Sequence, residues 1–287
     1  MRVGILPYEL RHEKNLATIP LNLLLWPSQD ADAGEPLGCI SDLSTNDHVV
    51  VYPSSTRLLR GFDGVSCKVD LLMAEPIAIQ KRYYQSIWLL RHKFNTIFCR
   101  YGKYARRYIN VHQLAVVESW VDGQAIEIPP VKSELCSIIA SGKQDLLGHQ
   151  MRHKVVTWAR QRGITLTVLG RGYAPFELKQ DGLLNYRFSV IIENVQELDY
   201  FTEKLLDCLL CGTMPIYWGA PNIGDYFETS GMLICHDLEQ IQQTIAMLPS
   251  SLSIKQTAAL ANNRAQALLY SDLNGRIASL IFNKERL

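Results

Sequence analysis

The chain has 287 residues, 47% of them hydrophobic, and its 29 Lys and Arg residues nearly balance its 28 Asp and Glu residues, for a formal net charge of +1 at pH 7. This length buries a sizeable core and suits two domains better than one. The near-neutral balance, with no basic stripe interleaved with aromatics, argues against a partner held by neutralising nucleic-acid phosphates. The apolar run that begins MRVGIL is too short for a signal peptide or a membrane span, so we expect a cytoplasmic protein.

The first half contains four short apolar runs that are typical of buried strands in a parallel sheet. They are Val3 to Leu6, His48 to Tyr52, Val69 to Met73 and Thr96 to Cys99. Gln29 to Pro36 is predicted to be an irregular loop.

A carboxylate follows the third of these runs, in the sequence Ala74-Glu75-Pro76. At the carboxyl end of a strand, the Glu75 side chain is expected to project into the crevice where α/β proteins bind ligands. Partial desolvation would suit it to accept a proton from a hydroxyl. Alternatively, Glu75 complements the dipole of a helix that begins at Ile77.

Ile128-Pro129-Pro130 marks a predicted boundary, after which strands and helices alternate. We therefore expect an α/β protein with two Rossmann-like domains, residues 1–130 and 131–287, with the C-terminal segment crossing back to the first. The strands expected in the second half are Glu134 to Ala140, Leu166 to Gly170, Phe188 to Ile192, Met214 to Trp218 and Met232 to Cys235. A further helix is expected from Ser253 to about Leu269.

The segment Gly148 to Lys154 opens a predicted helix that extends through Arg162. A helix N-terminus offers free N–H groups and the positive end of a dipole, and an arginine fork matches phosphate oxygens. His149 and Arg152 lie one turn apart and are therefore candidates for an anion site. The alternative is an ordinary solvated basic helix.

Residues Tyr186 to Phe227 combine two apolar strands with one helix. The first strand stops at Glu193-Asn194, where polar side chains would face a ligand crevice. Asp199 is predicted to cap a helix that is rich in leucine and ends at Gly212. Tyr200, Thr202, Glu203 and Lys204 then occupy its first turn. A lysine opposes the helix dipole there, so we expect an anionic ligand beside Lys204.

This segment resembles the donor-binding half of the α-1,3/4-fucosyltransferases, glycosyltransferase family ten. The matching residues are IEN at Ile192 to Asn194, DYFTEK at Asp199 to Lys204, and MPIYWGAPNI at Met214 to Ile223. The resemblance implies a GT-B-like fold, two Rossmann-like domains facing a cleft, the first on the acceptor side. It implies an inverting transfer of fucose from GDP-fucose to a hydroxyl of a glycan acceptor.

The resemblance also implies roles for particular residues. The residues expected to contact the donor are Asn194, Tyr200, Glu203 and Lys204, with Lys204 at phosphate, Glu203 at ribose or sugar hydroxyls, and Thr202 helping to cap the helix. Arg152 would stabilise the departing diphosphate, and Glu75 would be the catalytic base. Glu193 is either part of the donor site or a structural carboxylate buried by hydrogen bonds.

We expect no metal and no other cofactor. Asp30-Ala31-Asp32 is a DxD pattern, which binds manganese in the other large glycosyltransferase fold, but two acidic residues in such a loop are more simply solvated. The expected partners are a nucleotide sugar and a glycan acceptor, with no nucleic acid and no transmembrane segment; peripheral contact with a membrane stays open. The alternatives are a transferase for another nucleotide sugar and a non-catalytic sugar-nucleotide-binding protein.

Seven scattered cysteines fit a reducing compartment. Cys208 and Cys211 form a CxxC pattern late in the leucine-rich helix, far from the N-terminus that would stabilise a thiolate. We therefore expect core residues rather than a redox pair or a zinc site.

Overall fold

The computed structural model describes residues 1–27, 36–54 and 61–285. The chain divides into two compact units: unit 1 is Met1–Val116 with Leu273–Leu287, and unit 2 is Val117–Asp272. Asp30 and Asp32, the expected DxD pattern, lie outside the described residues.

Unit 1 contains a five-stranded parallel sheet with the strands in sequential order. The strands are β1 (Val3–Ile5), β2 (His48–Val51), β3 (Lys68–Met73), β4 (Ile97–Cys99) and β5 (Val111–Gln113). The four strands predicted for this half are present. The edge strand β5 was not predicted, because only Val111 of its three residues is buried and the segment shows no apolar run.

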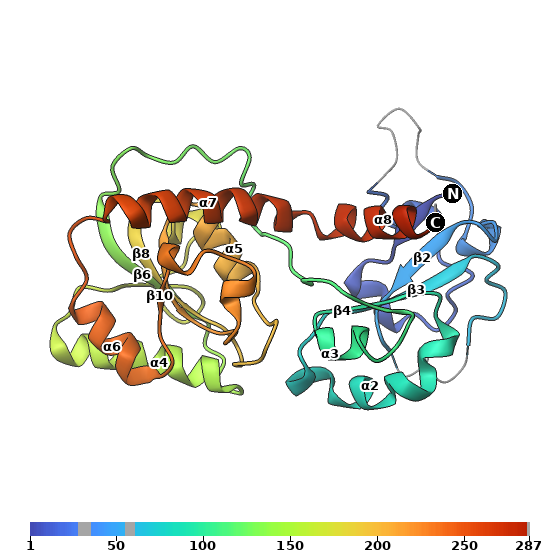
Figure 1. Ribbon diagram of the computed structural model, residues 1–287, viewed down its shortest axis with the longest axis horizontal. Helices are drawn as coiled ribbons and strands as arrows, with labels where there is room; N and C mark the ends of the chain where they lie inside the picture. The colour runs from blue at the N-terminus through green and yellow to red at the C-terminus, as the bar shows by residue number, and fades with distance from the viewer. Residues whose placement is uncertain (28–35, 55–60, 286–287) are drawn as a thin grey trace. The chain divides into compact units, whose positions relative to one another are not determined.

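Alternate side chains of this sheet feed two separate cores, as the period of a strand requires. Val49, Leu71 and Ile97 lie in one core, and Val50, Leu72 and Phe98 lie in the other. The first core is completed by α2 (Ile77–Leu90) and the second by α8 (Leu273–Lys284) (Figure 1). The shorter elements are α3 (Gly102–Ala105), η1 (Tyr8–His12), η2 (Leu21–Leu23), η3 (Ile40–Asp42) and η4 (Arg91–Lys93).

Unit 2 contains a second five-stranded parallel sheet, in the order β10-β9-β8-β6-β7. The strands are β6 (Glu134–Ile139), β7 (Thr167–Leu169), β8 (Tyr186–Ile192), β9 (Met214–Trp218) and β10 (Leu233–Ile234). All five were predicted. The chain runs outward from β6 to β7 and then returns to the other side of β6 as β8. This reversal makes a topological switch point between β6 and β8.

Four helices accompany this sheet, with α4 packed beside α6 and α5 beside α7 (Figure 1). They are α4 (Leu147–Arg162), α5 (Glu203–Leu210), α6 (Leu238–Ala246) and α7 (Ile254–Ser271), and the 3-10 helices are η5 (Lys179–Gly182), η6 (Ile223–Asp225) and η7 (Thr229–Gly231). Gly212 follows α5 with a φ of 60°, a left-handed conformation that favours glycine, so the predicted helix end is confirmed.

The units divide at Val116 and Val117, earlier in the chain than the boundary expected near Ile128. The intervening segment is bonded to unit 2. The Trp120 amide donates to Asp207 Oδ1 (2.9 Å), and Arg264 donates to the carbonyl of Gly123 (3.1 Å). These long-range bonds are invisible in the local sequence, which showed only the Pro129-Pro130 turn signal.

The seven cysteines form no disulfide, and all except Cys39 are buried. Burial raises the pKa of the Cys208 thiol well above its usual value and that of Cys211 to about 12. The expected core role of this CxxC pattern is confirmed.

Candidate functional site

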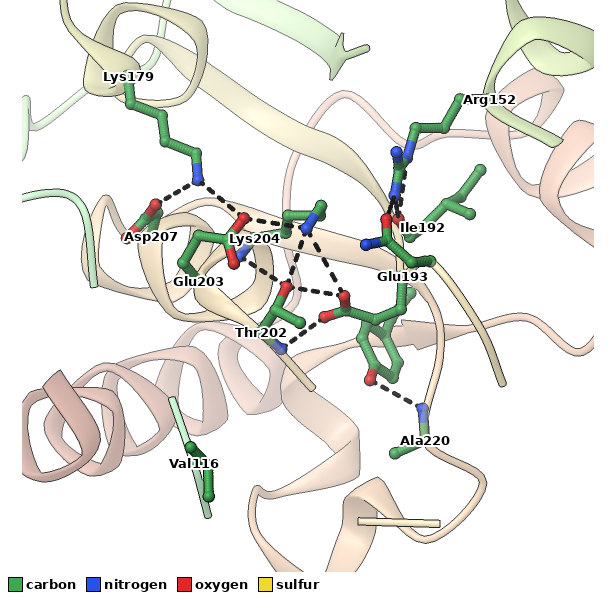
Figure 2. Close-up of polar contacts among 12 residues, drawn as sticks. Val116, Arg152, Lys179, Ile192, Glu193, Thr202, Glu203, Lys204, Asp207 and Ala220 are labelled. Atoms are coloured by element: carbon green, nitrogen blue, oxygen red, sulfur yellow. Dashed lines mark hydrogen bonds and ion pairs between the residues drawn. The ribbon is translucent and has the colours of Figure 1, made fainter. Parts of the chain in front are cut away.

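The polar residues singled out in unit 2 gather at the carboxyl ends of β6 and β8, beside the switch point (Figure 2). The chain leaves β6 and begins α4 at Leu147, and it leaves β8 through Glu193 and Asn194 and begins α5 at Glu203. Ligands of open α/β sheets bind at this position because the helix N-termini and the strand ends converge there.

The first turn of α4 is joined directly to the end of β8. The Gly148 amide donates to the carbonyl of Asn194 (3.1 Å). A Cβ atom at Gly148 would lie 1.7 Å from the Glu193 carbonyl oxygen, so only glycine fits this approach. One of the N–H groups expected to be free at this helix end is therefore already engaged.

Arg152 lies on the same helix and is buried. Its Nε donates to the carbonyl of Ile192 (3.0 Å), and Nη2 donates to that carbonyl and to Asn194 Oδ1 (3.0 Å) (Figure 2). Burial lowers the pKa of Arg152, and the nearby Glu193 and Glu203 oppose this change. In the described part of the chain no carboxylate lies within ion-pair distance of Arg152. The guanidinium is thus held by neutral oxygens and keeps its charge available for an anion.

His149 lies one turn before Arg152 and is also buried. Its Nδ1 has no hydrogen-bond partner among the described residues. Burial and the charge of Arg152 both lower the pKa of His149, so the ring is neutral near pH 7. An unpaired buried ring nitrogen is costly, and a ligand would satisfy it.

Glu193 is fully buried at the end of β8. Its Oε1 accepts from the Thr202 amide (2.8 Å), and its Oε2 accepts from the Thr202 hydroxyl (2.7 Å). Burial raises the pKa of Glu193, while Lys204 opposes this shift. This placement matches the structural alternative for Glu193, which fixes the start of α5 rather than reaching solvent.

The N-cap of α5 is Thr202, whose hydroxyl accepts from the Lys204 amide (3.4 Å), in agreement with the expected capping role. The prediction that Asp199 caps this helix is wrong. Asp199 adopts a left-handed φ of 62°, and its Oδ1 accepts from Asn222 Nδ2 and from the Tyr226 hydroxyl, both at 2.8 Å. Asp199 therefore ties the loop before α5 to the loop after β9.

Lys204 lies in the first turn of α5, as predicted, but its ammonium group is not isolated. Its Nζ donates to Glu203 Oε1 (2.9 Å) and Thr202 Oγ1 (3.1 Å) and lies 4.0 Å from Glu193 Oε2 (Figure 2). Burial raises the pKa of Glu203, but Lys204 and Lys179 outweigh it and bring that pKa down to about 2. These carboxylates already offset the lysine charge, which is a structural explanation that the sequence did not reveal.

A second ion pair supports this arrangement, and sequence reasoning missed it. Lys179 Nζ lies 2.7 Å from Asp207 Oδ2 and 3.7 Å from Glu203 Oε1, and it sits 4.3 Å from the centre of the Trp120 ring. Asp207 is fully buried, and burial raises its pKa against the effect of Lys179. The sequence feature that could have indicated this ion pair is Asp207 itself, a carboxylate one turn after Glu203 on an otherwise apolar helix face.

The predicted donor contacts differ in their access to solvent. Tyr200 is buried, whereas Asn194, Thr202, Glu203 and Lys204 are only half-buried. The accessible part of the site therefore consists of one amide, one hydroxyl and one carboxylate–ammonium pair beside the Arg152 guanidinium.

Glu75 belongs to unit 1 and follows β3, as expected. Its carbonyl accepts from the Tyr84 hydroxyl (3.1 Å). Burial raises the pKa of Tyr8, and the neighbouring Glu75 carboxylate raises it further, partly through a side-chain hydrogen bond. The N-cap residue of α2 is Pro76, and the Tyr101 hydroxyl accepts from the amide of Ile77 (2.9 Å), the first residue of this helix.

Within the residues that the structure describes, no helix is long and apolar enough to cross a membrane. The same residues contain no group of three or more His, Cys, Asp or Glu side chains that could hold a metal ion.

Residues 130–253 match the family model described as glycosyltransferase family 10 (fucosyltransferase), C-terminal. The α-(1,3)-fucosyltransferase FucT of Helicobacter pylori is 34% identical over 67 residues, 23% of this chain and 14% of that protein. The α-(1,3)-fucosyltransferase B of Drosophila melanogaster is 33% identical over 94 residues, 30% of this chain and 21% of that protein. Both matches thus span a minor part of these relatives.

The fold is also shared with solved structures. A crystal structure of α1,3-fucosyltransferase with GDP aligns with a TM-score of 0.54 and 16% identity, covering 82% of this chain and 76% of that one. Together with the two parallel sheets, this likeness confirms the GT-B fold. Residues 130–253, which lie in the unit that carries the site, are thus similar to the C-terminal part of glycosyltransferase family 10.

Proposed function

We propose that the protein is an inverting fucosyltransferase that moves fucose from GDP-fucose to a hydroxyl of a glycan acceptor. The observation that carries this proposal is the position of Arg152. It lies at the switch point of the unit that matches the family model, and neutral oxygens hold its guanidinium. The fucosyltransferase relatives and the likeness to an α1,3-fucosyltransferase solved with GDP support GDP-fucose as the donor.

In this proposal Arg152 and Lys204 stabilise the diphosphate. Negative charge grows on the diphosphate as the bond to fucose breaks, and a preorganised cation stabilises that charge without further reorganisation. His149 is neutral and has an unpaired buried Nδ1, which suits a hydrogen bond to a phosphate oxygen or its bound water. Glu203 accepts hydrogen bonds from ribose or sugar hydroxyls, and Asn194 contacts the donor beside Arg152.

Glu75 is the proposed catalytic base. Its carboxylate takes the proton of the acceptor hydroxyl as that oxygen attacks the anomeric carbon of fucose, and the diphosphate leaves with the bonding electrons. The contact with Tyr8 supports a defined carboxylate position. Its neighbour Asp70 is less suited, because it is fully buried and its Oδ2 lies 2.7 Å from His48 Nδ1.

We propose that this reaction uses no metal, with the charge supplied by Arg152 and Lys204. We also propose a cytoplasmic location, which the seven unbridged cysteines support because such thiols persist in a reducing compartment.

A panel of nucleotide sugars tests the donor. GDP-fucose and GDP should raise the melting temperature, since a ligand that binds only the folded state stabilises it, and UDP-sugars should not. Release of GDP that depends on a glycan acceptor would then establish transfer, and the anomeric configuration of the first product would establish inversion. Stabilisation by GDP-fucose without transfer to any acceptor would favour the non-catalytic binding protein, and stabilisation by another nucleotide sugar would favour a related transferase.

A further inference from the structure

Unit 1 carries a concentration of positive charge that the near-neutral total conceals. Residues 76–117 contain eight Lys and Arg residues and no Asp or Glu, although the whole chain has a net charge of only +1. Tyrosines are interleaved with these cations, as in RYGKYARRY at residues 100–108. The expectation that the chain has no basic stripe interleaved with aromatics is therefore wrong. The net charge of the whole chain does not reveal this basic segment, because acidic residues elsewhere balance it.

Five of these cations lie on α2, η4 and α3, namely Lys81, Arg82, Arg91, Lys93 and Lys103, and the other three, Arg100, Arg106 and Arg107, flank α3; Figure 1 labels α2 and α3. The ring of Tyr84 on α2 stacks on that of Tyr104 on α3, with 5.4 Å between their centres. The guanidinium carbons of Arg91 and Arg107 lie 4.9 and 5.4 Å from the centre of the Tyr108 ring. These contacts join α2 and η4 to residues 100–109. We call the surface that these segments form the basic face.

Five cations of the basic face are exposed: Lys81, Arg82, Lys103, Arg106 and Arg107. In the described chain none of these five has a carboxylate within ion-pair distance, and the nearby Tyr rings leave the positive charge intact. Lys103, for example, lies over the rings of Tyr101 and Tyr104. This contrasts with unit 2, where Lys179 and Lys204 are both paired with carboxylates.

Large aliphatic side chains are exposed among the same cations. Ile109 is 99% exposed, Leu89 is 53% exposed and Ile79 is 49% exposed. Leaving water stabilises an aliphatic side chain, and approaching an anionic surface stabilises the cationic side chains beside it. Both interactions are favourable together at the headgroup region of a bilayer.

We propose that the basic face docks the protein on the surface of an anionic lipid bilayer. Arg106, Arg107 and Lys103 contact the phosphate groups, and Ile109 enters the boundary between headgroups and acyl chains. The distribution of the tyrosines argues against a single-stranded nucleic acid. Such a ligand stacks its bases on exposed rings, whereas Tyr84 and Tyr101 are buried and Tyr104 is stacked on Tyr84.

Sedimentation of the full-length chain with vesicles tests the proposal. Phosphatidylcholine vesicles containing phosphatidylglycerol should bind the protein, phosphatidylcholine alone should not, and added salt should weaken binding by screening. Replacing Lys103, Arg106 and Arg107 together with Gln should weaken binding by about a hundredfold, because each cation near such a surface contributes about one kcal/mol. Ile109→Gln should weaken it by about tenfold or more.

A triple variant elsewhere provides the matched control. Lys14, Arg162 and Lys255 are exposed and lie outside the basic face, so changing all three to Gln should leave vesicle binding unchanged. Equal weakening by both triple variants would show only a dependence on total charge and would overturn the assignment to this face. Binding to heparin but not to anionic vesicles would overturn the bilayer as the partner, and so would equal binding to neutral and anionic vesicles.

Discussion

The two units share a five-stranded parallel sheet but arrange their ionisable groups differently. In unit 2 the carboxyl edge of the sheet carries the network of Arg152, Glu193 and Lys204. In unit 1 the buried pair His48 and Asp70 lies toward the amino ends of its strands, and Glu75 follows the carboxyl end of β3. The difference teaches that, in the proposed mechanism, donor binding depends on unit 2 and proton transfer depends on a separate carboxylate of unit 1. A variant can therefore lose one and keep the other.

The two cations of unit 2 differ in a related way. Arg152 is held by the carbonyl of Ile192 and the amide of Asn194, whereas Lys204 is held by the Glu203 carboxylate. A ligand phosphate can bind Arg152 without displacing a carboxylate. At Lys204 the same phosphate must compete with the carboxylates that already contact the ammonium group. We therefore expect Arg152 to contribute more to diphosphate affinity than Lys204.

The largest expected effect is on stability. Lys179→Met removes the partner of the fully buried Asp207 and should lower the free energy of unfolding by about 3 kcal/mol, since an uncompensated buried charge is costly. Urea denaturation measures this change.

The double variant Lys179→Met with Asp207→Asn provides the control. It removes both charges of the buried pair and should recover part of the lost stability. A double variant less stable than Lys179→Met alone would show that Asp207 is held by other contacts, such as its bond from the Trp120 amide.

The next prediction distinguishes the proposed proton transfer by Glu75 in unit 1 from the proposed donor binding in unit 2. Glu75→Gln keeps the shape of the side chain but cannot accept a proton, so turnover should fall by about a hundredfold or more while GDP affinity stays near wild type. Steady-state transfer assays and calorimetry give the two quantities.

Glu9→Gln serves as the matched change, because Glu9 is an exposed carboxylate of the same unit. It should leave turnover unaltered. Near-normal transfer by Glu75→Gln would exclude Glu75 as the base. Glu118 would then be the next candidate, because its side chain is accessible and its pKa is raised by partial desolvation of the carboxyl group and by Asp272.

A smaller effect is expected at Lys204. Lys204→Gln should weaken GDP binding by less than about tenfold, because Glu203 and Glu193 already offset its charge in the free protein. Calorimetric titration decides this. A loss larger than that of Arg152→Gln would reverse the ranking of the two cations.

The smallest effect on activity is expected from the removal of divalent metal ions. Transfer should continue unchanged in the presence of a chelator, because we assign the stabilisation of the diphosphate to Arg152 and Lys204. Loss of activity on chelation, restored by manganese, would show that these side chains do not suffice.

The sequence predicted those features that depend on local patterns. Apolar runs located β8 and β9, and Gly212 ended α5 where expected, because burial and left-handed φ leave local signatures. The start of α5 was misplaced, since Asp199 is an equally good capping residue by type and only its bonds to Asn222 and Tyr226 show its role.

Long-range pairing was out of reach of the sequence. Lys179 and Asp207 meet only after η5 and α5 have packed, and the bond from Trp120 to Asp207 moves the expected domain boundary. The sequence indicated the candidate site because Glu193 and Asn194 follow a strand and because Asp199 to Lys204 resemble the family motif. Their mutual charge balance, which ranks Arg152 above Lys204, required the structure.

The central claim is that Arg152 binds the diphosphate of the donor, and titration of GDP into three proteins tests it most directly. Arg152→Gln should weaken GDP binding by about tenfold to a hundredfold, the loss of one charge-assisted hydrogen-bonding group. Arg162→Gln, an exposed change at the other end of α4, should bind GDP like the wild type. Melting curves confirm that each variant is folded, and Arg152→Lys, which keeps the charge but loses the fork, replaces Arg152→Gln if that variant does not fold. Wild-type GDP affinity in a folded Arg152 variant would contradict the account.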